Sequence, residues 1–289
     1  MPVDLLDVIR GAARRAAEAA RKVEEEGLRA KPVGRGEGGD TSLLADREAE
    51  RAAIEYIVSK VGSAKIVSEE IGERVYGDEP QYVFVIDPID GSRNYKRGVP
   101  LYAVSIAAGA GETFEDLEAA VVYAPGLNAE YYASRGVAAW LNGAAIRVSG
   151  RKTLAGAVVG MSTTPKARFI PQVVALRLAE EGVVLRSWGS ISLELSYLAS
   201  GGLDGYIEAW GTARVVDVAA AYLIALEAGA TVRVRGRYSR APRLSLSERL
   251  AIVAAATEEL ADSLEKAYSE ALGWRPLEVF EVAAVDGLR

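Results

Sequence analysis

The segment from residue 87 to residue 92 concentrates the residue types best suited to metal chemistry. It reads Asp87-Pro88-Ile89-Asp90-Gly91-Ser92. The apolar run Tyr82–Ile86 before it predicts a buried strand, so two acids follow directly on a strand end. Pro88 keeps Asp87 extended, and Gly91 lets a ligand approach the backbone closely. Such an oxygen cluster suits Mg²⁺, and a helix starting at Ser92 would add an anion site beside it.

The composition confines any metal site to oxygen ligands. The 289 residues include neither cysteine nor histidine, which excludes disulfides, thiolate or imidazole metal sites and Ser-His-Asp triads. The formal charge is −6 and long basic runs are absent, so we expect no nucleic-acid partner. Asp-Pro and Asp-Gly pairs also form ordinary turns, so the acidic segment alone leaves a purely structural role open.

The charge pattern predicts neither a membrane span nor a signal peptide. The longest stretch without a charged residue, Gly98 to Gly111, is shorter than the about 20 apolar residues that a membrane-spanning helix needs. Asp4 and Asp7 precede the first basic residue, which is the wrong order of charges for a signal peptide. We therefore expect a cytoplasmic protein without a membrane partner.

Hydrophobic periodicity predicts a mixed α and β fold in two parts. The first part, residues 1–150, is α+β, and the second part, residues 151–289, is α/β, with a soft boundary near residue 150. Expected helices and strands of the first part are helix 4–26, a helix from about Ser42 to Lys60 after the Gly-rich segment 34–40, and strands 65–67, 82–86, 101–108, 119–123 and 130–133. Those of the second part are strands 157–161, 183–185, 203–207 and 231–234 and helices 171–181, 190–200 and 217–228.

Four motifs follow one another along the chain in a recognisable order. They are Val67-Ser68-Glu69-Glu70, the segment from Asp87 to Tyr95 with Gly98 and Pro100, the stretch from Tyr123 to Ser149, and the stretch from Val216 to Gly229. Together they resemble the inositol monophosphatase family, which includes archaeal enzymes that also act as fructose-1,6-bisphosphatases. One such motif would be weak evidence for a family, whereas four motifs in the same order are strong evidence. The resemblance spans roughly residues 4–260 and implies the sugar-phosphatase fold, a layered αβαβα sandwich.

The resemblance also implies a set of metal ligands. Those matching the first metal are Glu69, Asp87 and the Ile89 carbonyl, and those matching the second are Asp87, Asp90 and Asp217. The implied cofactor is Mg²⁺, two or three ions per site, with Mn²⁺ as a substitute. Ordinary roles stay open for some of these residues. Glu69 also suits the first turn of a helix, and Asp217 also suits a helix N-cap.

Asp46 and Ser92 resemble the pair that orients the attacking water, with Glu69 nearby. Asp46 lies in the first turns of its expected helix and equally suits a solvated helix position, while Ser92 also suits an N-cap. The family often has a basic residue in the loop before Asp46, which we leave unassigned between Lys31 and Arg35, and the chain departs from the family pattern at two further positions. Ser92 stands where the family usually has threonine, which keeps the hydroxyl, and Val216 stands where it has tryptophan.

The resemblance assigns a polyol-binding wall to the second part of the chain. Residues expected to contact substrate are Asp90, Gly91, Ser92, Gly189, Ser190 and Glu208. Arg168 and Arg186 lie in the same part, and either could bind a second phosphate through a bidentate guanidinium. For each arginine, a solvated surface position is the alternative.

The expected activity is Mg²⁺-dependent hydrolysis of a small phosphomonoester, with inositol 1-phosphate and fructose 1,6-bisphosphate as the expected substrates. Two metals supply charge neutralisation, an activated water and leaving-group stabilisation without a histidine. A nucleotide 3′-phosphatase acting on adenosine 3′,5′-bisphosphate is the alternative enzyme, and a regulatory binding protein is the alternative outside enzymes. The resemblance also implies a homodimer.

Overall fold

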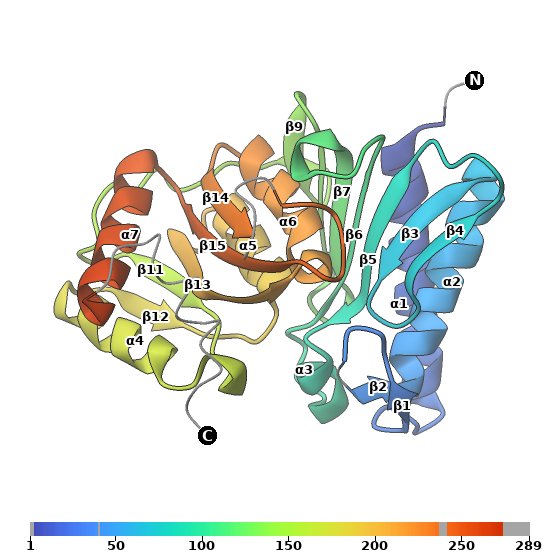
Figure 1. The fold of residues 1–289 in the computed structure, drawn as a ribbon, viewed down its shortest axis with the longest axis horizontal. Coiled ribbons are helices and arrows are strands. Elements are labelled where there is room, and N and C mark those ends of the chain that lie inside the picture. Colours follow the sequence, from blue (N-terminus) through green and yellow to red (C-terminus); the bar gives the residue numbers. More distant parts are fainter. Residues whose placement is uncertain (1–2, 40, 237–241, 274–289) are drawn as a thin grey trace.

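The computed structural model describes residues 3–39, 41–236 and 242–273, and it stacks helices and sheets in five layers (Figure 1). Two helices cover the outer face of each sheet, and two more lie between the sheets. The outer pairs are α1 (Leu5–Glu25) with α2 (Leu44–Val61) and α4 (Ile170–Glu180) with α7 (Glu258–Leu272), and the inner pair is α5 (Ile191–Ala199) with α6 (Val215–Glu227). The predicted αβαβα sandwich is confirmed.

The larger sheet has eight strands within the described residues, in the order β10-β9-β8-β7-β6-β5-β3-β4. Only β3 and β5 run parallel, and all other neighbours are antiparallel. The strands are β3 (Ala64–Ser68), β4 (Gly72–Tyr76), β5 (Val83–Asp90), β6 (Ala103–Gly109), β7 (Leu117–Ala124), β8 (Ala129–Ser134), β9 (Ala138–Leu141) and β10 (Ala144–Ala145). The predicted strands are confirmed, but β5 continues beyond residue 86 through the acidic segment.

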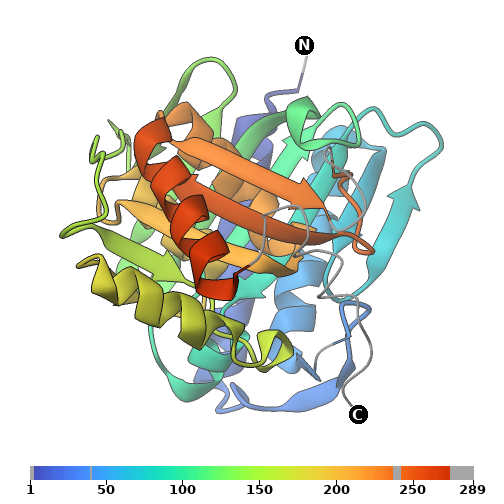
Figure 2. The same ribbon diagram turned by 60° about the vertical axis from the view of Figure 1, so that its left-hand side comes forward.

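The smaller sheet has five strands in the order β12-β11-β13-β15-β14 and carries α4 and α7 side by side on its outer face (Figure 2). It contains β11 (Val158–Met161), β12 (Val184–Arg186), β13 (Gly205–Arg214), β14 (Thr231–Gly236) and β15 (Arg249–Ala255). β11 runs parallel to β12 and β13, whereas β15 is antiparallel to both of its neighbours. β15 and α7 were absent from the predicted elements.

Short elements near the first helices correct one predicted boundary. β1 (Pro32–Arg35) pairs antiparallel with β2 (Thr41–Leu43), so Ser42 is extended and α2 begins only at Leu44. The remaining short elements are α3 (Ser92–Arg97) and the 3₁₀ turns Phe114–Asp116, Pro125–Leu127 and Pro165–Ala167. Asp40, the last residue of the Gly-rich segment, lies outside the described residues.

The core joins both parts of the chain. One cluster of buried side chains combines residues of the larger sheet with α5, α6 and the smaller sheet. This shared core does not mark a division near residue 150, and that division stays a prediction. In the described part of the chain, no helix is both long and apolar enough to cross a membrane.

α1 packs on α2 and on the larger sheet through an alanine face. Small side chains let the backbones approach closely, so extra methylenes there force neighbouring groups apart. We expect Ala16→Leu, at a fully buried position, to lower the free energy of unfolding by about 1–3 kcal/mol in urea denaturation. The matched control is Ala19→Leu on the same helix, because Ala19 lines an open groove. Equal losses for both variants would contradict close packing of this face.

Candidate active site

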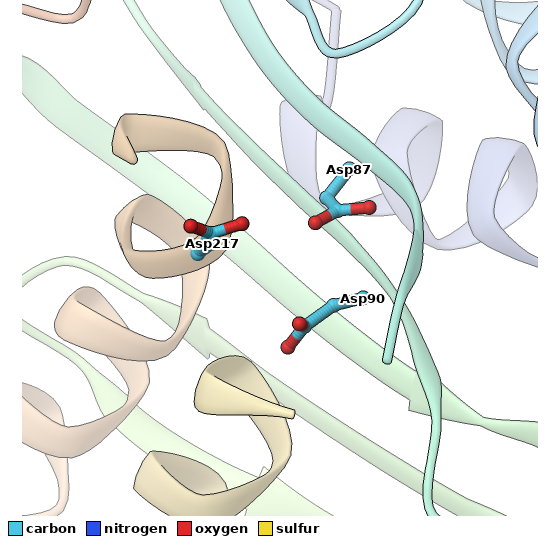
Figure 3. A group of neighbouring side chains, drawn as sticks. All are labelled: Asp87, Asp90 and Asp217. Atoms are coloured by element: carbon cyan, nitrogen blue, oxygen red, sulfur yellow. The ribbon is translucent and has the colours of Figure 1, made fainter. Parts of the chain in front are cut away.

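Three buried aspartates converge where β5 meets the N-terminus of α6. Asp87 and Asp90 come from the end of β5, and Asp217 comes from the first turn of α6 (Figure 3). Each offers one carboxylate oxygen, and these oxygens all lie within 4.8 Å of one another. The three residues are at most 7% exposed. The structure thus brings together three of the carboxylates that the sequence predicts as metal ligands.

An irregularity in β5 places the first two acids on one side. The register with β6 shifts between Asp87 and Asp90, and Asp87 Oδ1 accepts a hydrogen bond from Ile89 N at 3.1 Å. Gly91 then takes a φ of +90°, and a Cβ there would lie 3.0 Å from the Leu101 carbonyl oxygen. Glycine is therefore required where β5 turns into α3.

Asp90 is held from outside its own strand. Its Oδ2 accepts hydrogen bonds from Ser190 Oγ at 2.7 Å, Ser192 N at 2.7 Å and Ser192 Oγ at 2.6 Å, all at the start of α5. Burial, together with the nearby Asp217, raises the pKa of Asp90 to about 6. All three donors engage the same oxygen, Oδ2. Ser192 was missed by sequence reasoning, although Ser190 was predicted.

Asp87 is the most deeply buried carboxylate of the group. It is fully buried, and burial, followed by the charges of Glu69, Asp90 and Asp217, raises its pKa well above the usual range. Among the described residues, its Oδ2 has no hydrogen-bond partner. A buried acid in this situation needs a cation or a proton. An oxygen-only donor set with an orphaned oxygen fits a hard divalent cation such as Mg²⁺.

Glu69 lies at the turn between β3 and β4 and pairs with Arg214. The antiparallel pairing of β3 and β4 shows that this turn belongs to a hairpin, so the helix alternative for Glu69 is wrong. The Gly-rich segment covers the turn, since Gly38 N donates to Glu69 O at 2.8 Å. Glu69 does not belong to the group of oxygens within 4.8 Å, and its metal role stays a prediction.

Two charged residues that sequence reasoning missed, the buried Glu50 and the largely shielded Arg214, support this turn and the cluster. Glu50 Oε1 accepts Ser68 Oγ, Glu70 N at 3.0 Å and Ile71 N at 3.3 Å, which fixes the backbone around Glu69. Burial raises the pKa of Glu50 to about 7. Arg214 contacts both Glu69 and Asp217. The spacing of three residues between Arg214 and Asp217 at the start of a helix was the sequence signal that could have indicated this contact.

Asp46 is the third residue of α2 and is only 4% exposed, so the solvated alternative is wrong. Its Oδ2 accepts Leu43 N at 2.8 Å, and its Oδ1 is buried with no partner among the described residues. Burial, opposed by the hydrogen bond from Leu43, raises the pKa of Asp46 to about 8. A buried carboxyl with a raised pKa is a candidate proton acceptor.

Ser92 is the first residue of α3, and Gly91 occupies the N-cap. The N-cap alternative for Ser92 is therefore wrong. Its Oγ donates to the Ile89 carbonyl at 3.0 Å, the same carbonyl that was predicted as a metal ligand. No hydrogen bond between Ser92 and Asp46 occurs among the described contacts. Their joint role in orienting water stays a prediction. Asp217 is likewise the third residue of α6 rather than its N-cap.

The predicted substrate wall begins at the N-terminus of α5. Ser190 is the N-cap of this helix, and Gly189 before it has a φ of +80°. Glu194, which sequence reasoning missed, accepts Trp188 N at 2.6 Å and Gly189 N at 3.0 Å through Oε1 and so fixes this turn. Burial raises the pKa of Glu194 to about 8. The wall is thus held by an acid inside α5.

Glu208 lies within β13 and is fully buried. Its Oε1 accepts Thr212 N at 2.8 Å and Thr212 Oγ1 at 2.6 Å, while its Oε2 has no partner among the described residues. Burial raises the pKa of Glu208 to about 8. One oxygen therefore has a structural role, and the contact of Glu208 with substrate stays a prediction.

The two predicted phosphate-binding arginines lie in the second part of the chain. Arg168 has a positive φ of 54°, and Arg186 ends β12, where its Nη1 donates to the Leu185 carbonyl at 2.9 Å. Both side chains belong to exposed residues. Their role in binding a distal phosphate stays a prediction.

Comparison with known proteins identifies the family. Residues 2–270 match the model of the inositol monophosphatase family. The chain is 36% identical over 192 residues to an inositol-1-monophosphatase of Rhizobium meliloti, covering 64% of this chain and 68% of that protein. It is 32% identical to a fructose-1,6-bisphosphatase/inositol-1-monophosphatase of Methanothermobacter thermautotrophicus, covering 79% of this chain and 84% of that one.

A solved structure agrees in fold as well. The extragenic suppressor protein SuhB of Bartonella henselae superposes with a TM-score of 0.77 at 26% identity, covering 92% of this chain and 98% of that chain. Since the family model matches nearly the whole chain and the relatives exceed 30% identity, the assignment does not depend on the fold alone. The chain therefore belongs to the inositol monophosphatase family, a family of phosphoric monoester hydrolases.

Proposed function

We propose that this protein is an Mg²⁺-dependent phosphomonoesterase that hydrolyses inositol 1-phosphate, fructose 1,6-bisphosphate or both. The observation that carries the proposal is the buried convergence of Asp87, Asp90 and Asp217 around an orphaned carboxylate oxygen. A binding module has no use for acids gathered at such electrostatic cost. The regulatory alternative is therefore less favoured, although one relative in fold is named as a suppressor protein.

The ligand set that would hold two or three divalent cations is drawn from both parts of the chain. It comprises Glu69, Asp87, the Ile89 carbonyl, Asp90 and Asp217. When bound, such cations neutralise the ester oxygens, activate water and stabilise the leaving alkoxide, and Mn²⁺ can supply the same chemistry. The carboxylates themselves bring charge and fixed geometry, because one oxygen of each aspartate accepts a hydrogen bond: Asp87 from Ile89 N, Asp90 from Ser190 Oγ and Asp217 from Arg214 N.

Asp46 and Ser92 prepare the water for attack in this proposal. Burial keeps the pKa of Asp46 near 8, so its carboxyl group exchanges a proton close to neutral pH. Ser92 Oγ donates its proton to the Ile89 carbonyl, so it is left to accept a hydrogen bond from a water molecule. Positioning of water by a fixed hydroxyl contributes at the transition state rather than to substrate binding.

The second part of the chain binds the alcohol moiety. Gly189 leaves room for a ring, Ser190 Oγ and the free oxygen of Glu208 offer polar contacts, and Gly91 permits close approach to the backbone. These acceptors suit a polyol. A nucleotide 3′-phosphatase is the alternative within the superfamily, and a panel of phosphate esters including adenosine 3′,5′-bisphosphate separates the two. We also propose a cytoplasmic homodimer, which size-exclusion chromatography with light scattering tests.

Asp87→Asn tests the metal mechanism. We expect kcat to fall by at least ~10²–10³-fold, because an essential charge that holds the cations is lost. In EDTA, however, the variant should melt at the wild-type temperature or above. A neutral side chain avoids the free-energy cost of burying a charged carboxylate, the same cost that raises the pKa of Asp87. Activity of the wild-type protein should vanish in EDTA and return with Mg²⁺.

The matched control for this variant is Asp204→Asn. Asp204 is also buried, but it accepts hydrogen bonds from Ser149 and Val158 and lies outside the acidic cluster. The Asp204→Asn variant should lose thermal stability and keep its kcat, the opposite of the result expected for Asp87→Asn. Near-normal turnover by Asp87→Asn, or full wild-type activity after exhaustive chelation, would reject the metal mechanism.

Ser92→Ala tests the water-orienting role. We expect kcat to drop by at least ~10²-fold with little change in KM. Ser59→Ala is the control, because Ser59 Oγ also donates to the carbonyl three residues back, at 2.6 Å, in α2. If Ser92→Ala changes only the melting temperature, as the control should, then Ser92 is structural.

Arg168→Ala and Arg186→Ala test the distal phosphate site. We expect at least one of them to raise KM for fructose 1,6-bisphosphate about tenfold while KM for inositol 1-phosphate stays unchanged, since only the bisphosphate loses a charged partner. Inositol 1-phosphate serves as the internal control. Equal effects on both substrates, or none, would exclude both arginines from this site.

A further inference from the structure

The guanidinium of Arg214 lies between two predicted metal ligands. Its Nη1 pairs with Glu69 Oε1, and its Nη2 pairs with Asp217 Oδ1 at 2.7 Å. Glu69 belongs to the turn after β3 in the larger sheet, whereas Arg214 ends β13 in the smaller one. One side chain therefore connects an acid beside the larger sheet with an acid in the first turn of α6, far apart in the sequence.

Arg214 engages both oxygens of Asp217. Oδ2 accepts the Arg214 backbone N–H at 2.8 Å and Nε at 3.2 Å. Oδ1 accepts Nη2 at 2.7 Å and Nε at 3.2 Å. A carboxylate surrounded in this way has few lone pairs left for a metal. A cation that binds Asp217 must therefore displace the guanidinium from at least one oxygen.

The three partners are shielded from water, which makes the interaction strong. The side chains of Arg214, Glu69 and Asp217 are 15%, 10% and 9% exposed, respectively. A buried carboxylate pair without a cation would repel strongly, so the arginine compensates it. The fork geometry of a guanidinium suits two carboxylates at once, which a compact ammonium does not match.

We propose that Arg214 is an internal counter-cation that holds Glu69 and Asp217 together in the metal-free protein and competes with divalent metal for them. The inference rests on the proposed metal-dependent function, because it assumes that these acids bind cations. Arg214 thereby acts as a positioning residue: it keeps the ligands assembled before metal binds and weakens metal affinity by occupying them. Metal binding is thus an exchange of one cation for another.

The test compares MnCl₂ binding by isothermal titration calorimetry with thermal melting in EDTA. Removing a positive charge and a competitor should lower the Kd of Arg214→Gln for Mn²⁺ about tenfold. Its melting temperature in EDTA should fall by a few degrees, roughly 2–4 °C, because the acids lose their compensation. Arg214→Lys keeps the charge but not the fork, so both effects should be smaller.

Arg233→Gln is the matched control. Arg233 is similarly shielded, at 20% side-chain exposure, and pairs with Glu258, Asp262 and Glu265 between β14 and α7. This variant should lose stability without any change in Mn²⁺ affinity. If Arg214→Gln does not fold in EDTA, the test uses Arg214→Lys instead. Its Kd for Mn²⁺ should then be lower than that of the wild-type protein, by less than tenfold.

Two results overturn the inference and can be told apart. Wild-type protein that binds Mn²⁺ while Arg214→Gln or Arg214→Lys binds it equally or more weakly rejects competition but leaves the proposed function intact. Wild-type protein that binds no Mn²⁺ rejects both. Tighter Mn²⁺ binding by Arg214→Gln, together with its loss of stability in EDTA, supports the exchange.

Discussion

Repulsion among carboxylates that have been removed from water is the constraint around which this structure is organised. At an effective dielectric constant of about 20, two unit charges 4 Å apart interact by roughly 4 kcal/mol, and Asp87, Asp90 and Asp217 present oxygens within 4.8 Å of one another. Each acid is therefore held by donors that it does not share with the others. Those donors are Ile89 N for Asp87, the serines of α5 for Asp90, and Arg214 for Asp217.

These donors explain why the site needs five layers. α5 and α6 lie between the two sheets (Figure 1), and the first residues of both helices lie beside the end of β5. Ser190 and Ser192 from α5 fix Asp90, while α6 delivers Asp217 in its first turn. A single sheet with helices on its outer face alone would leave Asp90 without its three donors. The layered fold and the acidic cluster therefore depend on each other, because α5 and α6 form the middle layer and also supply the contacts at the acids.

The layers were predicted through the resemblance to the family, and the central acids through the motifs that carry this resemblance. Strand and helix periodicity located most elements, and the motif around Asp87 indicated Asp87 and Asp90 as candidate ligands at a strand end. The predicted start of the second helix was wrong because Ser42 belongs to a short strand, β2, which pairs with β1 just before it in the chain. Glu50 escaped prediction because its partners lie in the distant turn after β3, and Arg214 because one of its two partners is the equally distant Glu69. Glu194 instead contacts the turn just before its own helix, a role that hydrophobic periodicity does not indicate. On a helix, a charged residue such as Glu50 has the pattern of a solvated face, and only the packed turn after β3 reveals its burial.

The sequence separation between the halves of the ligand set has a consequence for biosynthesis. Asp87 and Asp90 leave the ribosome well before Arg214 and Asp217, with α5 also still to be made. At about 5–20 residues per second, translation of the intervening chain takes on the order of ten seconds. During that interval the end of β5 carries acids with neither their serine donors nor the arginine of β13. The nascent first sheet must therefore keep this edge hydrated, and burial of the acids waits for the arrival of α5 and α6.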